Sequence, residues 1–164
     1  MKYPLTSLAQ VRQLREENAA MEYAAREKAL LIAQRETLAR RKALEDHLAW
    51  RKKEEDRRYR EILGKEMSRK EMDAFKAGVA ALREKDNILL EAVEEARKAE
   101  EEAARHRDEA AATLKQRRRE MDKIDTHQEI WQTSEAIEAG RREDLEMEEF
   151  TGLKRPDMRE DNDD

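Results

Sequence analysis

A strict spacing of apolar residues constrains this chain more than any other feature. From Met72 to Trp131, alternating steps of three and four select eighteen positions, of which thirteen are apolar. Because these steps average about 3.5 residues, the selected side chains fall on one narrow stripe of a helix, as in a coiled-coil seam. The same register continues with Glu135, Glu138 and Arg142, so we expect the seam to end near Trp131.

Composition explains why such a helix needs a partner helix. Charged residues make up 46% of the 164 residues and aromatic residues 4%, which excludes a globular core. The charges are mixed in sign and interleaved with Ala, Leu and Met, so long helices are favoured over disorder. The chain has no cysteine, which excludes disulfides and thiolate metal sites.

The helical pattern stops and restarts once, in the stretch "LGKEMSRKEMDAF". Gly64 is suited to the residue after a helix end, because glycine enters the left-handed conformation without a steric cost. Ser68 and Glu71 have the spacing of a capping box, which starts a new helix. Met67 and Met72 flank this box at the positions of a hydrophobic staple. The alternative interpretation is a kink in one continuous helix.

Upstream of the turn, apolar residues are sparser and recur at helical spacing. We expect them to form the stripe that packs on the second helix, because helices joined by a short connection are usually antiparallel neighbours. Paired positions would then add up to about 132, which places Leu8 near Ile124 and Trp50 near Leu82. A parallel homodimeric coiled coil is the competing arrangement. The predicted stripe consists of Leu5, Leu8, Val11, Leu14, Met21, Leu31, Leu38, Leu44, Leu48, Tyr59 and Ile62.

The predicted fold is therefore all-α: a long antiparallel two-helix coiled-coil hairpin over residues 1–152. Its first helix covers about 5–63, its turn 64–68, and its second helix about 69–150. At about 1.5 Å per residue, the helices would reach ~85 Å and ~120 Å. Residues 153–164 are predicted to form a disordered acidic tail.

Charge is unevenly distributed along the chain. Residues 35–70 carry 13 basic and 8 acidic side chains, whereas residues 135–164 carry 5 and 12. Because basic and acidic residues alternate in the first segment, intrahelical pairs on a solvated face are favoured over a nucleic-acid site. The chain has no run of eighteen apolar residues and no apolar signal segment at its start, so we expect no membrane insertion.

Residues with catalytic or metal-binding chemistry give no recognisable site. His47, His106 and His127 are widely separated, and none has the i, i+4 partner of a helical zinc site. A phosphate-binding glycine loop and a nucleophile motif are both missing, so we expect no enzymatic activity, cofactor or metal. The candidate partner-binding residues are the larger apolar side chains Leu5, Leu8, Trp50, Tyr59 and Trp131.

The start "MKYPLTSLAQVRQLRE" and the turn sequence "ILGKEMSRKEMDAFKAGVAALREKD" resemble the YscO group of type III secretion proteins, which are relatives of the flagellar protein FliJ. The resemblance spans the chain except its tail. It rests on the Tyr3-Pro4-Leu5 start, the overall length and the early turn.

This resemblance implies a cytoplasmic stalk at the base of a secretion apparatus. Family members form monomeric antiparallel hairpins similar to the coiled coil of the rotary ATPase gamma subunit, and stand in the pore of the hexameric secretion ATPase. The resemblance also implies contact with the cytoplasmic domain of the export gate and association with chaperones of translocator proteins. The competing functions are a structural tether and a homodimeric scaffold without an ATPase partner.

Overall fold

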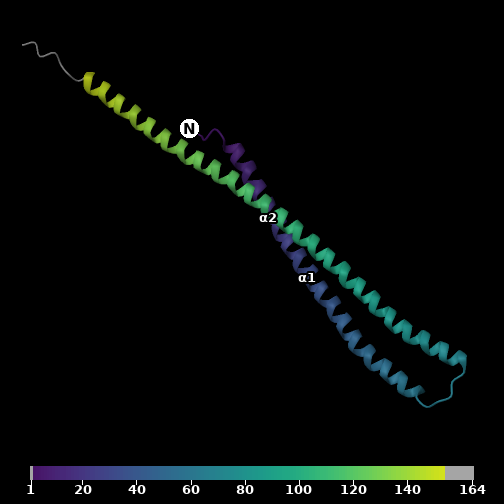
Figure 1. Ribbon diagram of the computed structural model, residues 1–164. Coiled ribbons are helices and arrows are strands. Elements are labelled where there is room, and N and C mark those ends of the chain that lie inside the picture. Colours follow the sequence, from purple (N-terminus) through teal and green to yellow (C-terminus); the bar gives the residue numbers. More distant parts are fainter. Residues whose placement is uncertain (1, 154–164) are drawn as a thin grey trace, which may run out of the picture. The chain divides into compact units, whose positions relative to one another are not determined.

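A computed structural model describes residues 2–153, which form two helices joined by a short connection (Figure 1). Helix α1 covers Thr6–Ile62 (57 residues) and helix α2 covers Arg69–Leu153 (85 residues). Residues 2–153 contain no strand, and the predicted all-α fold is confirmed. Leu153, placed in the tail by the sequence pattern, is the last residue of α2, whereas the rest of the predicted tail lies outside the described residues.

The chain divides into two compact units. The hairpin unit consists of residues 18–114 and contains the connection between the helices. The described part of the terminal unit consists of residues 2–17 and 115–153. Within each unit α1 and α2 run antiparallel (Figure 1).

The predicted seam of α2 is confirmed in the hairpin unit. Every seam position there is buried or half-buried, including the charged ones at Asp86, Glu100 and Arg107. Alanine is frequent among the most buried positions, so the helices approach closely while each contact contributes little apolar burial. The most buried seam residues of this unit are Val79, Ala96, Ala110 and Leu114.

The predicted stripe of α1 is wrong. Nine of its eleven residues are exposed, and only Leu44 and Ile62 are half-buried. The residues of α1 that are buried in the hairpin unit are Ala19, Leu30 and Thr37. They belong to a register of three and four steps whose other positions hold arginine, alanine, tyrosine, leucine, histidine and glutamate. The half-buried members of this register in the hairpin unit are Tyr23, Ala33, Leu44, His47, Arg51, Glu54 and Arg58.

The seam of α2 also continues through the terminal unit. Ile124 is its most buried residue, and Arg117, Met121, Gln128 and Trp131 are half-buried. Beyond Trp131, α2 has no α1 segment beside it within this unit, because α1 begins only at Thr6. The residues that follow are exposed except for two half-buried positions, in agreement with the predicted end of the seam. These two positions are Glu135 and Gly140.

Cross-helix contacts fix the register of each pair. In the hairpin unit, the Thr37 hydroxyl donates to the carbonyl of Ala96 at 3.2 Å. In the terminal unit, Arg12 Nη1 donates to the carbonyl of Glu120 at 2.8 Å. The first pair of positions adds to 133 and the second to 132, which agrees with the predicted value of about 132.

Candidate functional site

The connection between the helices has the backbone geometry of a glycine stop. Gly64 has a φ of 75°, in the left-handed region that other residues rarely adopt. The amide of Lys65 donates to the carbonyl of Ile62 at 3.1 Å, which satisfies a carbonyl at the end of α1. Helix α1 therefore ends at a defined residue, and the chain reverses within a few residues.

The start of α2 contains both hydrogen bonds of a capping box. The Ser68 amide donates to Glu71 Oε2 at 2.8 Å, and the Glu71 amide donates to Ser68 Oγ at 3.2 Å. The Met72 amide donates to the Ser68 carbonyl at 3.0 Å and forms the first helical bond. Met67 and Met72 are half-buried beside this cap, and their pairing as a staple stays a prediction. The cap fixes where the second helix begins.

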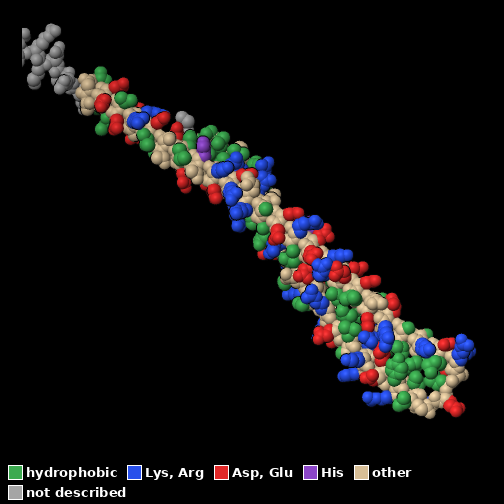
Figure 2. All heavy atoms as spheres, in the orientation of Figure 1, with side chains coloured by type: hydrophobic (Ala, Val, Ile, Leu, Met, Phe, Trp, Pro, Cys, Tyr) green, Lys and Arg blue, Asp and Glu red, His purple; other side chains and the backbone are tan. Residues whose placement is uncertain are grey.

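Hydrophobic side chains gather next to the connection in the hairpin unit (Figure 2). The rings of Tyr59 and Phe75 meet edge to face, with their centroids 5.1 Å apart. Such a pair stabilises the end of the hairpin beyond its apolar burial. Tyr59 is still 48% exposed, so about half of the residue is accessible to another molecule.

A layer of charged side chains crosses the seam of the hairpin unit. His47 Nε2 lies 3.1 Å from Asp86 Oδ1, and Arg51 Nε lies 2.7 Å from Asp86 Oδ2. Glu55 Oε1 lies 2.9 Å from Arg51 Nη1 and 3.1 Å from Arg83 Nε. Neither Arg51 Nε nor Asp86 Oδ1 makes a well-aligned hydrogen bond within the protein, although both are shielded from solvent. Because shifting one helix would separate these charges, the layer specifies the register of the pair.

The pKa values of two glutamates in this region fall below their ordinary range. Hydrogen bonds from Arg57 and Arg58 lower the pKa of Glu54 to about 2. A hydrogen bond from Arg83, together with one from Arg51, lowers the pKa of Glu55. Both carboxylates are therefore ionised at neutral pH and hold arginines in fixed positions. This network is structural, because each glutamate has arginine partners within the same unit.

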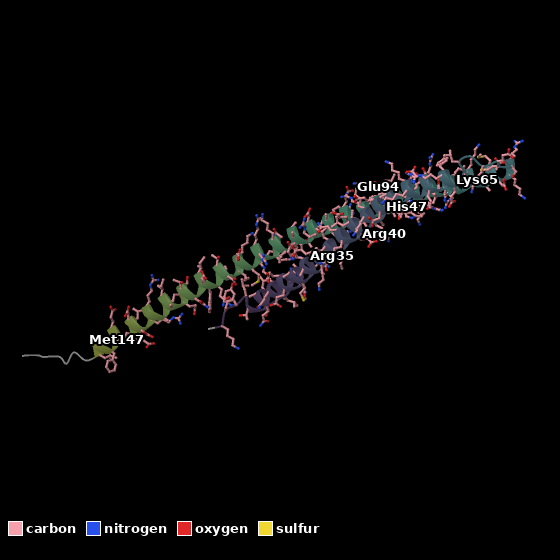
Figure 3. The ribbon with its side chains drawn as sticks, turned by 90° about the horizontal axis from the view of Figure 1, so that it is seen from below. Arg35, Arg40, His47, Lys65, Glu94 and Met147 are labelled. Atoms are coloured by element: carbon pink, nitrogen blue, oxygen red, sulfur yellow. The ribbon has the colours of Figure 1, made fainter. Side chains whose placement is uncertain are left out.

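Trp50 lies beside the charged layer. Its ring centroid is 5.6 Å from that of His47, and the side chain is 50% exposed. A half-exposed tryptophan offers apolar area together with an indole N–H, a combination that is enriched at the centres of protein interfaces. Figure 3 labels His47 on this part of α1. Trp50 and Tyr59 thus lie in one unit and are both accessible.

The terminal unit is held together by a residue that the sequence analysis did not select. Tyr3 is buried, its hydroxyl is 2.7 Å from His127 Nδ1, and its ring meets Trp131 edge to face at 5.5 Å. Leu5 and Leu8 are exposed on the adjacent start of α1. The only sequence feature that drew attention to Tyr3 was the Tyr3-Pro4-Leu5 start. Because Tyr3 precedes α1, no helical periodicity predicts which residues it contacts.

The last part of α2, residues 132–153, extends beyond the positions that face α1 within the terminal unit. It carries seven acidic and two basic side chains. Ile137, Leu145 and Met147 are exposed along it, and Figure 3 labels the last of these. This segment presents an acidic surface with isolated apolar side chains.

The described residues contain neither a metal-binding cluster nor a membrane-spanning stretch. Over residues 2–153, no three His, Asp or Glu side chains come together in a way that would hold a metal ion. Neither α1 nor α2 contains a stretch apolar enough to cross a membrane. The predicted partner-binding residues fall into two groups: Leu5, Leu8 and Trp131 in the terminal unit, and Trp50 and Tyr59 in the hairpin unit.

Comparisons with known proteins agree with this arrangement. The YscO structure from Vibrio parahaemolyticus is similar with a TM-score of 0.80 and 21% identity, covering 89% of this chain and 92% of that one. The YscO homologue CT670 from Chlamydia trachomatis is similar with a TM-score of 0.77 and 21% identity, covering 93% and 94%. A sequence comparison with curated proteins gave no match. The model of the family described as type III secretion protein YscO matches residues 5–153, and the chain therefore belongs to the YscO family of type III secretion proteins.

Proposed function

We propose that this type III secretion protein is the central stalk of a secretion ATPase complex. It binds the hexameric ATPase and the cytoplasmic domain of the export gate, and it hydrolyses nothing itself. The observation that carries the proposal is the family match over residues 5–153. The relationship to FliJ, which the resemblance implies, supports the stalk role. In this role the protein works in the cytoplasm at the base of the apparatus, where it also associates with chaperones of translocator proteins.

The geometry of the terminal unit supports this role. A single chain in a six-fold ring meets six subunits in non-equivalent ways, and can therefore stabilise different conformations in different subunits. Residues 132–153 of α2 are exposed on all sides of the helix except at two half-buried positions. Such a helix can present different side chains to each surrounding subunit.

The two groups of exposed residues supply the proposed contacts. Leu5, Leu8 and Trp131 belong to the terminal unit, which we assign to the ATPase ring. Trp50 and Tyr59 belong to the hairpin unit, which we assign to the export gate or to chaperones. Each is exposed or half-buried, so a partner can bury additional apolar area there.

The test is the activity of the cognate hexameric ATPase with the purified chain added. The chain alone should show no ATPase activity, and should raise the activity of the ring at about one chain per six subunits. Removing residues 1–14 should abolish the stimulation, whereas removing the residues after Pro156 should leave it unchanged. Helical circular dichroism and Trp50 fluorescence would show that the hairpin unit of each variant is folded.

Two leucines provide a matched pair of milder variants. Leu8 in the terminal unit and Leu48 in the hairpin unit have the same exposed fraction, 38%. Leu8→Ala should weaken stimulation, and Leu48→Ala should not. If the intact chain neither binds nor stimulates the ATPase at low salt, and the truncated and intact forms support secretion equally, the stalk proposal fails and a structural tether becomes the better account. A concentration-dependent dimer mass in solution would instead support the homodimeric scaffold.

A further inference from the structure

Helix α1 of the hairpin unit carries a second stripe of regularly spaced residues on the face that points away from α2. The inner register of α1 includes Leu30, Ala33 and Thr37, which face α2. Shifting this register by two residues rotates it by about 200°, onto nearly the opposite face of the helix. The shifted positions, here called the outer stripe, are Met21, Ala24, Lys28, Leu31, Arg35, Leu38 and Lys42.

All seven residues of the outer stripe are exposed. The largest apolar ones have about half to two thirds of their surface in water, with Leu31 at 46%, Leu38 at 64% and Met21 at 65%. The stripe keeps alternating steps of three and four over about 30 Å of helix. The helix therefore presents the spacing of a coiled-coil seam to the outside, with no partner helix of this unit on it.

The three cations of the outer stripe have no anionic partner. Lys28, Arg35 and Lys42 make no ion pair or hydrogen bond with any other residue between positions 2 and 153. The sequence explains this for Lys28 and Arg35, because every residue three or four positions away from either of them is Ala, Leu or Ile. Neither can form the intrahelical pairs by which Arg26 and Arg40 bind glutamates.

A shallow groove runs beside the outer stripe. It is formed within the hairpin unit by α1 together with one arginine of α2. Ala24, Lys28 and Leu31 belong to both the stripe and the groove, and Arg107 adds a further cation to the lining of the groove. Figure 3 labels Arg35 and Arg40 on this part of α1. The residues that line the groove are Ala24, Glu27, Lys28, Leu30, Leu31, Gln34 and Arg107.

We infer that the outer stripe is a docking site for an amphipathic helix of another protein, one that carries aliphatic residues at coiled-coil spacing and glutamates or aspartates between them. Aliphatic side chains of this helix would pack on Leu31 and Leu38, and its carboxylates would pair with Lys28, Arg35 and Lys42. Ion pairs of this kind beside a seam determine the choice of partner.

Charge argues for a foreign acidic helix over the other occupants. Two copies of the outer stripe in contact would place the three cations of one against the three cations of the other, with no carboxylate at any of the seven positions. An anionic membrane or a nucleic acid would also be attracted by the cations. A membrane or a nucleic acid on the stripe would, however, also lie against Glu27 and Glu45, which flank the stripe at about 60° around the helix axis. For a nucleic acid, the stripe also has no aromatic ring on which a base could stack.

The inference stands apart from the stalk proposal, because its test uses no ATPase. The probe is a stapled helical peptide with leucines at steps of three and four and glutamates between them. Two control peptides have lysine or glutamine in place of every glutamate. Fluorescence anisotropy with the full-length chain should show binding of the glutamate peptide only, weakening as salt is added.

Variants assign the binding to the outer stripe. Replacing Lys28, Arg35 and Lys42 by glutamate should weaken binding of the glutamate peptide by about tenfold or more, and should create binding of the lysine peptide. The matched control replaces Lys52, Lys65 and Lys70 by glutamate, which makes the same change in formal net charge. This control should bind like the wild type. Leu31→Ser with Leu38→Ser should also abolish binding without loss of helical circular dichroism.

Several outcomes would overturn the inference. These are no binding of the glutamate peptide at millimolar concentration, equal binding of all three peptides, or equal weakening by the control triple variant. Binding of anionic phosphatidylserine vesicles or of duplex RNA through the same three cations, without binding of the glutamate peptide, would assign the stripe to a membrane or a nucleic acid instead. A sequence-matched peptide of residues 21–42 that binds the chain better than the glutamate peptide would assign it to a second copy.

Discussion

Two leucines of α1 test which face of this helix packs against α2. Leu30 is 8% exposed and belongs to the inner register, whereas Leu38 is 64% exposed and belongs to the outer stripe. They lie on the same helix and in the same unit, so their replacement by alanine makes the same chemical change in two environments. The predictions for Leu30→Ala and Leu38→Ala therefore differ only through packing.

The magnitudes follow from burial. Leu→Ala removes the equivalent of about three carbon groups, each worth about 0.8 kcal/mol when buried, so Leu30→Ala should cost about 2–3 kcal/mol of unfolding free energy once a small cavity is included. Leu38 is already mostly in water. Its replacement should cost less than about 0.5 kcal/mol, because the little burial that is lost is partly offset by the higher helix propensity of alanine.

Tryptophan fluorescence makes the measurement specific for the hairpin unit. Trp50 belongs to that unit and Trp131 to the terminal unit, so a Trp131→Phe background leaves one reporter in the unit that contains both leucines. Urea unfolding of the two variants would then give two midpoints at a common slope. Equal losses of stability, or a larger loss for Leu38→Ala, would mean that the outer stripe is the packed face and would refute both the assigned register and the docking inference.

Three further predictions concern the connection, acid stability and the charged layer. Ser68→Ala should destabilise the protein by about 1 kcal/mol, because it leaves the Glu71 amide without its acceptor, whereas the exposed Ser134→Ala should change the thermal midpoint much less. The pKa of Glu54 is lowered to about 2, so the stability that it adds is present above its ordinary pKa of 4.5 and is lost as the pH falls towards 2. The thermal midpoints of Glu54→Gln and wild type should therefore differ near neutral pH and converge near pH 2, and a constant difference would contradict the assignment. Asp86→Ala should destabilise the hairpin unit in urea unfolding followed by Trp50 fluorescence by about 1–3 kcal/mol, since His47 and Arg51 lose their shared carboxylate partner, and an unchanged midpoint would show that the layer is not coupled.

The packed face of α2 could be predicted from the sequence because most of its seam positions hold apolar residues. Thirteen of eighteen seam positions are apolar, so counting them identifies both the face and its end at Trp131. The connection between the helices could also be predicted, since Gly64 and the Ser68–Glu71 pair each have a specific role in the backbone geometry. For the α2 seam and the connection, the local sequence was sufficient to predict the structure.

The α1 half could not be predicted in the same way, because its packed face carries small and charged residues. Ala19, Thr37 and His47 lie at seam positions, and larger residues such as Leu38 lie outside them. Counting apolar residues therefore selected the wrong face. The periodic signal is present in the steps of three and four through Leu30 and Thr37, but only the contacts with α2 distinguish it from the outer stripe.

The candidate partner-binding residues were only partly accessible to sequence reasoning. Trp50 and Tyr59 are exposed large side chains, as expected for interface residues. Tyr3 was missed because it precedes α1, and its partners His127 and Trp131 lie more than 120 positions away in the sequence. A contact over that separation depends on the register of the helices, and no local pattern encodes it.

The stoichiometry of the complex with the hexameric secretion ATPase tests the central claim most directly. Native mass spectrometry of the assembled ring with excess purified chain would count the copies bound. A central stalk predicts one copy per six ATPase subunits, because a second chain has no room in the same pore and the six subunits share one axis. Six copies per ring, or no bound copy under conditions where the ring is intact, would contradict the account.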